Sequence, residues 1–214
     1  MDKVACIIQC RSASTRLPNK CFLPFGEISI IEHIYNEAFC SEYIKGNVFV
    51  AVPFDDYSLI RYLAIRKIKL FTGSGDNVLD RYYQCAKLIN PDHVVRITAD
   101  CPLLTSDIID KTVLAHLENG ADYTANRLEE PAYPDGFDVE VFKYWFLEEA
   151  LAVTSILEEG DTEHVTPWIK RNSIVTKAVH CPENLFPYKD IKLSVDTQED
   201  YERVLKWRED NQWK

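Results

Sequence analysis

The feature that most constrains the fold of this chain is an alternation of short β-rich apolar runs with longer segments of helical periodicity. Strands are expected at residues 4–9, 48–52, 69–71 and 93–98. Helices are expected at residues 28–39, 55–65, 78–88 and 106–118. Strands and helices that alternate through short links predict a mostly parallel, doubly wound (Rossmann-like) α/β sheet. Such a sheet binds its ligands at the carboxyl ends of the strands.

The second half of the sequence is less regular. Strands are expected at residues 139–142, 174–179 and 191–195, and helices at 144–157, 161–170 and 197–207. Ser106 and Asp161 are polar residues of the kind that cap helices, and they are expected to begin the 106–118 and 161–170 helices. The chain contains no internal repeat, low-complexity tract or linker. A single domain spanning residues 1–214 is therefore expected.

Composition excludes several classes of protein. A formal charge of −10 and a pI near 5.0 argue against a general nucleic-acid binder, which needs a basic face. Seven cysteines without a C-x-x-C pair favour reduced thiols over a zinc or disulfide site. The first residues lack a signal-peptide layout, and no apolar run approaches the ~18 residues of a transmembrane helix. We expect a cytoplasmic protein with no membrane or nucleic-acid partner.

The segment after the first expected strand is positively charged, whereas the chain as a whole is negatively charged. Between Cys10 and Gly26 there are three basic residues, Arg11, Arg16 and Lys20, and no acidic one. We call residues 11–20 the basic loop. Arginine grips phosphate bidentately and lysine supplies a point charge, so the loop suits a polyphosphate. A solvated surface loop is the alternative. The loop matches neither G-x-x-x-x-G-K-[ST] nor G-x-G-x-x-G, which disfavours P-loop and nicotinamide-dependent enzymes.

Two carboxylates are expected near this loop, because Asp100 and Asp196 each follow an expected strand. Together they can hold one Mg²⁺ that also takes triphosphate oxygens. Each also has a purely structural interpretation. Asp100 can form an Asx-turn before Cys101, and Asp196 can cap the helix that begins at Thr197, with Glu199 completing a capping box.

A further acidic cluster, Asp135, Asp138 and Glu140, follows a Pro-Asp-Gly turn. The two-residue period of a strand places Asp138 and Glu140 on one face. This cluster can contact an acceptor, hold a second metal ion, or form a solvated strand face. Glu163 is explained by its position at a helix start, and His164 is not assigned as a catalyst.

The basic loop reads R-x-x-S-x-R-L-P-x-K, and this motif resembles the signature of cytidylyltransferases that make CMP-activated acidic sugars. These include the deoxy-manno-octulosonate and acylneuraminate enzymes and, nearest in pattern, the spore-coat polysaccharide biosynthesis group. Ala99 and Asn19 stand where relatives often carry glycine. The resemblance continues through residues 73–74, 78–83, 96–103, 121–124, 134–142, 163–167 and 195–200.

The resemblance implies a Mg²⁺-dependent nucleotidyltransferase in which an acceptor oxygen attacks the α-phosphorus of CTP and pyrophosphate leaves. It implies a homodimer, with a small β-rich acceptor or dimerisation region at about residues 121–145. It assigns Asp100 and Asp196 to the metal. Asp135, Asp138 and Glu140 are the residues that we expect to contact the acceptor. The catalytic set is Arg11, Arg16, Lys20 and Asp100. The nucleotide-binding set is Gln9, Cys10, Arg11, Ser14, Arg16, Lys20, Ser74 and Arg81.

Some alternatives remain open in the sequence. Arg81 can instead form a surface ion pair with Asp80. A nucleotide-sugar-dependent glycosyltransferase shares this type of sheet, but it usually carries D-x-D, whereas residues 99–102 hold one carboxylate. A non-catalytic nucleotide-binding partner in polysaccharide synthesis would have lost a metal ligand or loop cation, and none is missing. Nonulosonic acids, deoxy-octulosonate and phosphorylated compounds all remain possible acceptors.

Overall fold

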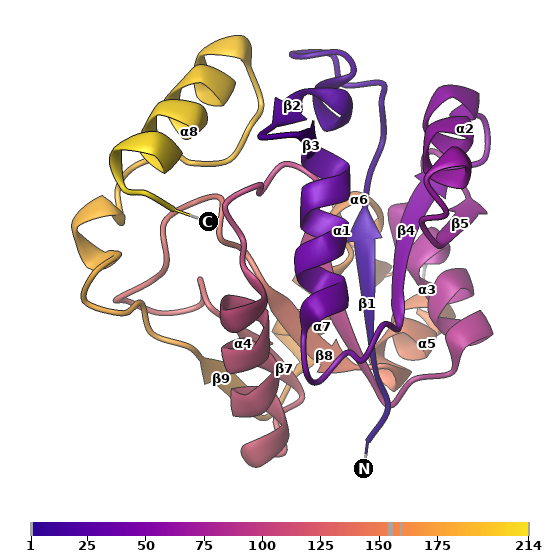
Figure 1. Ribbon diagram of the computed structural model, residues 1–214. Helices are drawn as coiled ribbons and strands as arrows, with labels where there is room; N and C mark the ends of the chain where they lie inside the picture. The colour runs from indigo at the N-terminus through magenta and orange to yellow at the C-terminus, as the bar shows by residue number, and fades with distance from the viewer. Residues whose placement is uncertain (1, 154–155, 159, 214) are drawn as a thin grey trace.

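The computed structural model describes residues 2–153, 156–158 and 160–213. Its centre is a seven-stranded sheet with the order β5-β4-β1-β6-β8-β7-β9 (Figure 1). Strand β1 pairs in parallel with β4 and β6, whereas β8 runs antiparallel to β6 and β7. The predicted mostly parallel α/β sheet is confirmed. The strands are β1 (Val4–Gln9), β4 (Val48–Pro53), β5 (Leu70–Gly73), β6 (His93–Thr98), β7 (Tyr123–Ala125), β8 (Glu140–Lys143) and β9 (Thr176–Ala178).

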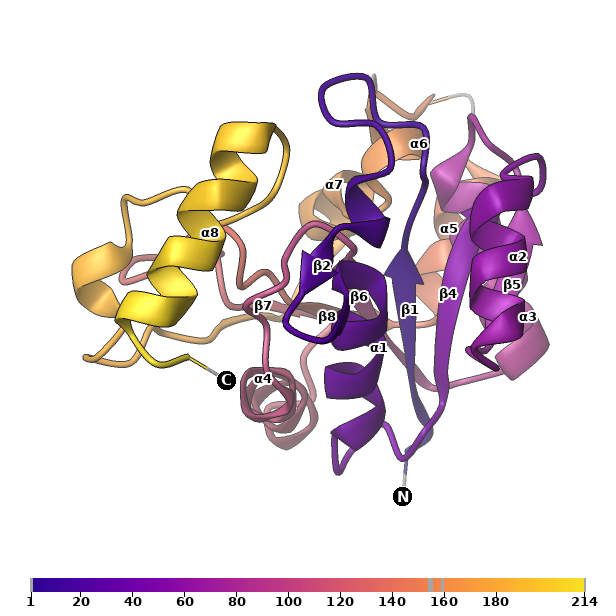
Figure 2. The same cartoon turned by 45° about the horizontal axis from the view of Figure 1, so that its top comes forward.

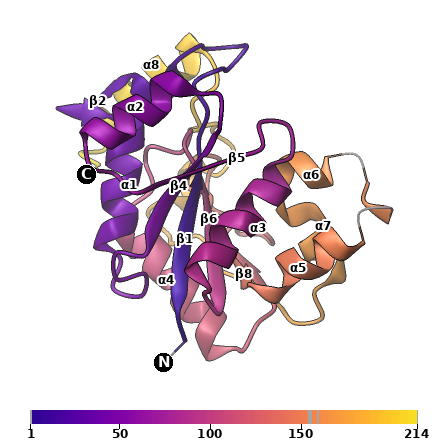
Figure 3. The ribbon, with the colours of Figure 1, turned by 90° about the vertical axis from the view of Figure 1, so that its right-hand side faces the viewer.

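Helices cover both faces of this sheet (Figure 3). Helices α1, α2, α4 and α8 contribute side chains to one hydrophobic core, and α3, α5 and α7 contribute to a second core on the other face. The bounds are α1 (Ile30–Cys40), α2 (Tyr57–Ile65), α3 (Val78–Ile89), α4 (Ser106–Glu118), α5 (Trp145–Ala152), α6 (Asp161–His164), α7 (Thr166–Asn172) and α8 (Gln198–Asp210). None of the helices in the described residues has the length and apolarity that crossing a membrane requires.

Strand β1 illustrates why the buried strands read as continuous apolar runs. Cys6 and Ile8 point into the core under α1, while Ala5 and Ile7 point into the core under α3. All four are fully buried. A strand covered by helices on both faces has no solvated side and therefore no polar alternation.

The connection from β1 to α1 is long and contains several short elements. It includes a 3₁₀ turn, η1 (Lys20–Phe22), and a hairpin of β2 (Pro24–Phe25) and β3 (Ile28–Ser29). The expected helix at 28–39 therefore begins two residues later, because Ser29 forms a capping box with Glu32. The loop after β1 and the short helix α6 lie side by side above the end of β1 (Figure 2).

Several of the expected strands, helices and helix caps are corrected. Residues 191–195 form no strand: the Leu193 N–H donates to the Asp135 carbonyl at 2.6 Å, and the Val195 N–H donates to the Asp100 carbonyl at 2.8 Å. These partners lie in loops. The segment packs so closely on Gly136 that a Cβ there would lie 2.3 Å from the Leu193 carbonyl carbon, and Gly136 has a φ of +110°. Only glycine tolerates this combination.

The predicted helix at 161–170 is divided. Val165 has a φ of +67°, so α6 ends before it and α7 starts after it. Asp161 lies inside α6 rather than at its cap, and its carboxylate accepts from the Glu158 N–H and from Arg171, both at 2.7 Å.

The predicted helix at 144–157 ends at Ala152, and its expected residues 154–155 lie outside the described residues. Helix α4 is preceded by Thr105 at the N-cap, not Ser106, whose N–H instead donates to Glu37 at 2.8 Å.

Candidate functional site

The basic loop is closed at its base by Ser12. The Ser12 carbonyl accepts from the N–H groups of Ser14 and Asn19, both at 2.9 Å. Asn19 has a φ of +61°, a left-handed conformation that glycine adopts freely and asparagine tolerates better than most residues. This explains how asparagine can occupy a position where related sequences often carry glycine.

Lys20 brings the two predicted metal ligands together. Its Nζ lies 3.2 Å from Asp100 Oδ2 and 3.1 Å from Asp196 Oδ1, and it donates to the Val195 carbonyl at 2.7 Å. The Lys20 side chain is only 14% exposed. Two carboxylates that are far apart in sequence therefore share one ammonium group at the carboxyl edge of the sheet.

Asp196 is surrounded by positive charge. Besides Lys20, Arg16 Nη2 lies 2.9 Å from its Oδ1 and Lys192 Nζ lies 2.9 Å from its Oδ2. Burial acts to raise the pKa of Asp196, but the hydrogen bonds and charges of Lys192 and Lys20 outweigh it and lower that pKa. The carboxylate therefore stays charged and retains its affinity for cations.

The alternative interpretation of Asp196 as a helix cap is wrong. Thr197 caps α8, and the capping box is completed by Asp200 rather than Glu199. Asp200 also accepts from Lys192 at 2.7 Å, and its pKa is lowered to about 2, because hydrogen bonds from Lys192 and Arg203 outweigh the opposing effect of burial. Within the described residues, Asp100 receives hydrogen bonds from Lys20 and the Cys101 thiol, and no backbone N–H makes an Asx-turn with it.

A cavity of about 260 Å³ opens at this point, and eight of the predicted residues line it. Its wall also contains residues that sequence reasoning did not assign to the site, among them Arg96, Thr98, Glu163 and His164. Glu163 and His164 belong to α6, which lies beside the end of β1 although no local pattern predicts that position. The eight predicted residues in the wall are Gln9, Cys10, Arg11, Ser14, Arg16, Lys20, Asp100 and Asp196.

The other two predicted nucleotide contacts, Ser74 and Arg81, do not line this cavity. Arg81 is 1% exposed and donates to the Ser74 carbonyl, so a surface ion pair with Asp80 is wrong. Burial and the nearby charge of Arg11 lower the pKa of Arg81. The Ser74 hydroxyl accepts from the Asn77 N–H at 3.0 Å. Their contact with nucleotide stays a prediction.

Arg96 is the most informative residue that the sequence reasoning missed. It lies within β6, donates to Gln9 Oε1 at 3.3 Å, and pairs with Glu140 of β8. Burial opposes its charge, but the Glu140 carboxylate outweighs that effect and raises the pKa of Arg96. The sequence does contain a signal for this residue, because Arg96 lies between the apolar residues Val95 and Ile97 of an expected strand. A charge buried in a strand requires a partner.

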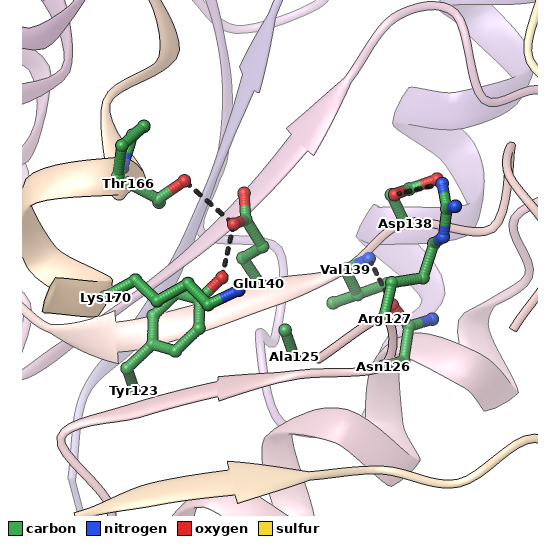
Figure 4. A pocket seen from close by; sticks show the side chains of 10 residues that line it. Tyr123, Ala125, Asn126, Arg127, Asp138, Val139, Glu140, Thr166 and Lys170 are labelled. Carbon is green, nitrogen blue, oxygen red and sulfur yellow. Dashed lines mark hydrogen bonds and ion pairs between the residues drawn. The ribbon is translucent and has the colours of Figure 1, made fainter. Parts of the chain in front are cut away.

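Glu140 lies in the wall of a second cavity, of about 340 Å³ (Figure 4). Its Oε1 accepts from the Tyr123 hydroxyl at 2.5 Å and from the Thr166 hydroxyl at 2.8 Å. Since Arg96 lines the first cavity and holds Glu140 in the second, one ion pair forms part of both walls. The second cavity is lined by Tyr123, Ala125, Asn126, Arg127, Asp138, Val139, Glu140, Thr166, Pro167 and Lys170.

The rest of the acidic cluster is held by Arg127, whose Nη1 lies 3.4 Å from Asp135 and 3.3 Å from Asp138. Asp138 and Glu140 both line the cavity, but Asp135 does not. Asp138 lies before β8 rather than within it, so the two-residue period of a strand is not the reason. Burial, with the like charges of Asp135 and Glu140, raises the pKa of Asp138 despite the opposing effect of Arg127. Lys170 is exposed, and its side chain makes no ion pair or hydrogen bond within the described residues.

Comparisons with known proteins bear on the family and the fold of this chain. Residues 5–212 match the family model described as "Cytidylyltransferase". The spore coat polysaccharide biosynthesis protein SpsF of Bacillus subtilis is 29% identical over 211 residues, which cover 95% of this chain and 85% of SpsF. The solved structure of a cytidylyltransferase from Leptospira borgpetersenii has a TM-score of 0.85 at 29% identity, covering 98% of this chain and 87% of that one.

A more distant solved structure extends the fold comparison. CMP:2-keto-3-deoxy-manno-octonic acid synthetase complexed with CTP has a TM-score of 0.71 at 17% identity, covering 98% of this chain and 99% of that one. At this identity the likeness concerns the fold. It agrees with the mostly parallel sheet and flanking helices described above.

Proposed function

The chain belongs to the cytidylyltransferase family, and from this premise we propose that it transfers CMP from CTP to an acidic sugar or similar acceptor and releases pyrophosphate. The related SpsF protein supports a role in making surface polysaccharide or another glycan. The observation that carries the proposal is that Lys20 of the basic loop pairs with both Asp100 and Asp196 in the wall of the first cavity.

The transfer needs little covalent chemistry from the protein, because phosphoryl-type transfer depends mainly on positioning and charge neutralisation. Arg11, Arg16 and Lys20 would hold the β- and γ-phosphates and neutralise the charge that builds on the leaving pyrophosphate. The acceptor oxygen forms a bond to the α-phosphorus as the bond from that phosphorus to the bridging oxygen of pyrophosphate breaks. Where the acceptor is a hydroxyl group, its proton is released to solvent. The Gln9 side chain, fixed by Arg96, lies in the same wall and can contribute to recognition of the base.

The donor set fits a magnesium ion. Asp100 and Asp196 present hard oxygen atoms that already converge on one cation, the Lys20 ammonium. Within the described residues no three acidic, histidine or cysteine side chains form a metal cage. Mg²⁺ is usually held by one or two carboxylates together with substrate phosphates. When bound there, Mg²⁺ would supply positive charge to the phosphates of the nucleotide.

The second cavity is the proposed acceptor site, because it shares the Arg96–Glu140 ion pair with the first. Asp135, Asp138 and Glu140 were expected to contact the acceptor, and the last two line this cavity. Glu140 is engaged by three donors, however, and Arg127 pairs with Asp135 and Asp138. Two exposed cations line this wall: Arg127 is paired with Asp135 and Asp138, whereas Lys170 makes no ion pair within the described residues. Figure 4 shows the Lys170 side chain extending alongside Tyr123. An acidic group on the acceptor would therefore bind at Lys170, which supports an acidic sugar.

The reaction is tested by incubating the protein with CTP, Mg²⁺ and a panel of nonulosonic acids, deoxy-octulosonate and phosphorylated sugars, followed by mass spectrometry. A CMP-linked product with stoichiometric pyrophosphate supports the proposal. Sugar transfer from a nucleotide sugar would support the glycosyltransferase alternative, and nucleotide binding without any product would support a non-catalytic partner. The homodimer and the cytoplasmic location stay predictions.

For whichever acceptor reacts, Lys170→Met should raise the acceptor KM by roughly tenfold or more, the scale of one hydrogen bond to a charged group. The KM for CTP should not change, because Lys170 lines only the second cavity. Lys111→Met is the matched control, since Lys111 is also exposed on a helix but lies in neither cavity wall. An unchanged acceptor KM in Lys170→Met would remove Lys170 from the acceptor site.

A further inference from the structure

We propose that Asp56 is the positioning residue of the basic loop, acting through Ser12 to hold Arg11 and Lys20 in the arrangement that receives phosphate. Asp56 lies after β4, outside every motif that the sequence assigned to the site. It does not line the cavity that contains Asp100 and Asp196. The inference rests on the proposed function, because it takes the basic loop to be the phosphate-binding element.

The Asp56 carboxylate accepts hydrogen bonds both from the start of α2 and from the basic loop. Its Oδ1 accepts from the Leu59 N–H at 3.2 Å, which caps α2, and from the Ser58 hydroxyl at 3.0 Å. Toward the loop, Oδ1 accepts from the Ser12 hydroxyl and Oδ2 accepts from the Ser12 N–H, both at 2.7 Å. A helix cap needs only one of these oxygens. The second oxygen and the two short bonds to Ser12 serve the loop.

Ser12 transmits this restraint to the cations of the loop. Its N–H and hydroxyl bind Asp56, while its carbonyl receives the N–H groups of Ser14 and Asn19. The chain therefore enters and leaves the loop at one fixed peptide. Arg11 immediately precedes this closure and Lys20 immediately follows it. A displacement of Ser12 would move both cations together, and misplacement by about 1 Å can cost on the order of 10²-fold in rate.

The charge of Asp56 makes these bonds strong. Burial acts to raise the pKa of Asp56, but the hydrogen bonds from Ser12, Leu59 and Ser58 outweigh it and lower that pKa. The ionised carboxylate forms charge-assisted hydrogen bonds, which are stronger than neutral ones. The positive N-terminus of α2 favours the same ionised state. Asp56 thus anchors the basic loop to the start of α2.

The variant that tests this role is Asp56→Ser, because serine can still cap α2 but cannot span both contacts to Ser12. We expect CTP affinity, measured by calorimetry with Mg²⁺, to fall on the order of tenfold. Adding Ser12→Ala to Asp56→Ser should cause no further loss, whereas Ser12→Ala alone should weaken binding. The matched control is Asp55→Ser, which removes the same charge at the neighbouring, exposed position and should bind CTP like the original protein.

Amide hydrogen exchange of the free protein provides a readout that does not require CTP. Asp56→Ser should accelerate exchange in residues 11–20 while leaving the α2 segment protected, and Asp55→Ser should do neither. Exchange in residues 11–20 that is unchanged by Asp56→Ser would overturn the positioning role. If the original protein bound no CTP while Asp56→Ser still accelerated exchange in residues 11–20, the proposed function would fail and the anchoring role would stand.

Discussion

Replacing Lys20 with alanine is expected to lower turnover by on the order of 10³-fold, the scale measured when a charge-neutralising cation is removed from phosphoryl transfer. Lys20 contacts Asp100 and Asp196 and also lines the cavity proposed for the triphosphate. The variant therefore loses a phosphate contact and leaves two neighbouring carboxylates without their shared cation. Steady-state turnover with CTP and an active acceptor measures the effect.

A change in folding must be separated from this loss. Lys20 is mostly buried, so Lys20→Ala should also lower the melting temperature, whereas Arg16 is 63% exposed and Arg16→Ala should not. Lys192→Ala is the matched control, because it removes another cation from Asp196 but lies outside the cavity wall. A loss in Lys192→Ala as large as that in Lys20→Ala would mean that Lys20 acts only by stabilising Asp196.

Asp100→Asn and Asp196→Asn are each expected to slow turnover by roughly 10²-fold or more and to weaken its dependence on Mg²⁺. Because Thr197 and Asp200 cap α8, Asp196→Asn should leave that helix intact. The double variant should be little slower than the poorer single variant, since residues that act as a unit are not additive. Magnesium titrations of initial rate measure this directly.

The control for this pair is Asp190→Asn, which removes an exposed carboxylate away from both cavities. It should leave both the rate and the magnesium titration unchanged. A silent Asp196→Asn with an unaltered titration would show that Asp196 only pairs with the nearby cations and would leave Asp100 as the sole ligand.

Local patterns in the sequence were enough to predict the sheet and the position of the basic loop. Strand β1 is buried on both faces and reads as an apolar run, and the helices of the first half follow their apolar periodicity. The rule that parallel strands end at one edge placed Asp100 beside the basic loop. Asp196 lies at the same edge for another reason. The strand expected at residues 191–195 does not form, and the loop in its place is held beside Asp100 by the hydrogen bond from the Val195 N–H to the Asp100 carbonyl.

The remaining features depend on contacts between distant residues. Residues 191–195 look like a strand, but their N–H groups bind the carbonyls of Asp135 and Asp100 in loops. Val165 divides a continuous helical pattern with a positive φ of +67° that no local signal predicts. The Arg96–Glu140 pair and the Asp56–Ser12 contact each join two segments of the sheet edge. Local periodicity carries no information about such pairs.

The central claim, that the first cavity binds CTP, is tested most directly by thermal melting with Mg²⁺ and equal concentrations of CTP, ATP, GTP or UTP. Ligand that binds the folded state stabilises it by mass action, by about 2.7 kcal/mol at 100 times its Kd. CTP should raise the melting temperature more than the other three nucleotides, and Arg16→Ala should reduce that rise. Equal shifts with all four nucleotides would contradict the assignment to cytidine and leave a general triphosphate site.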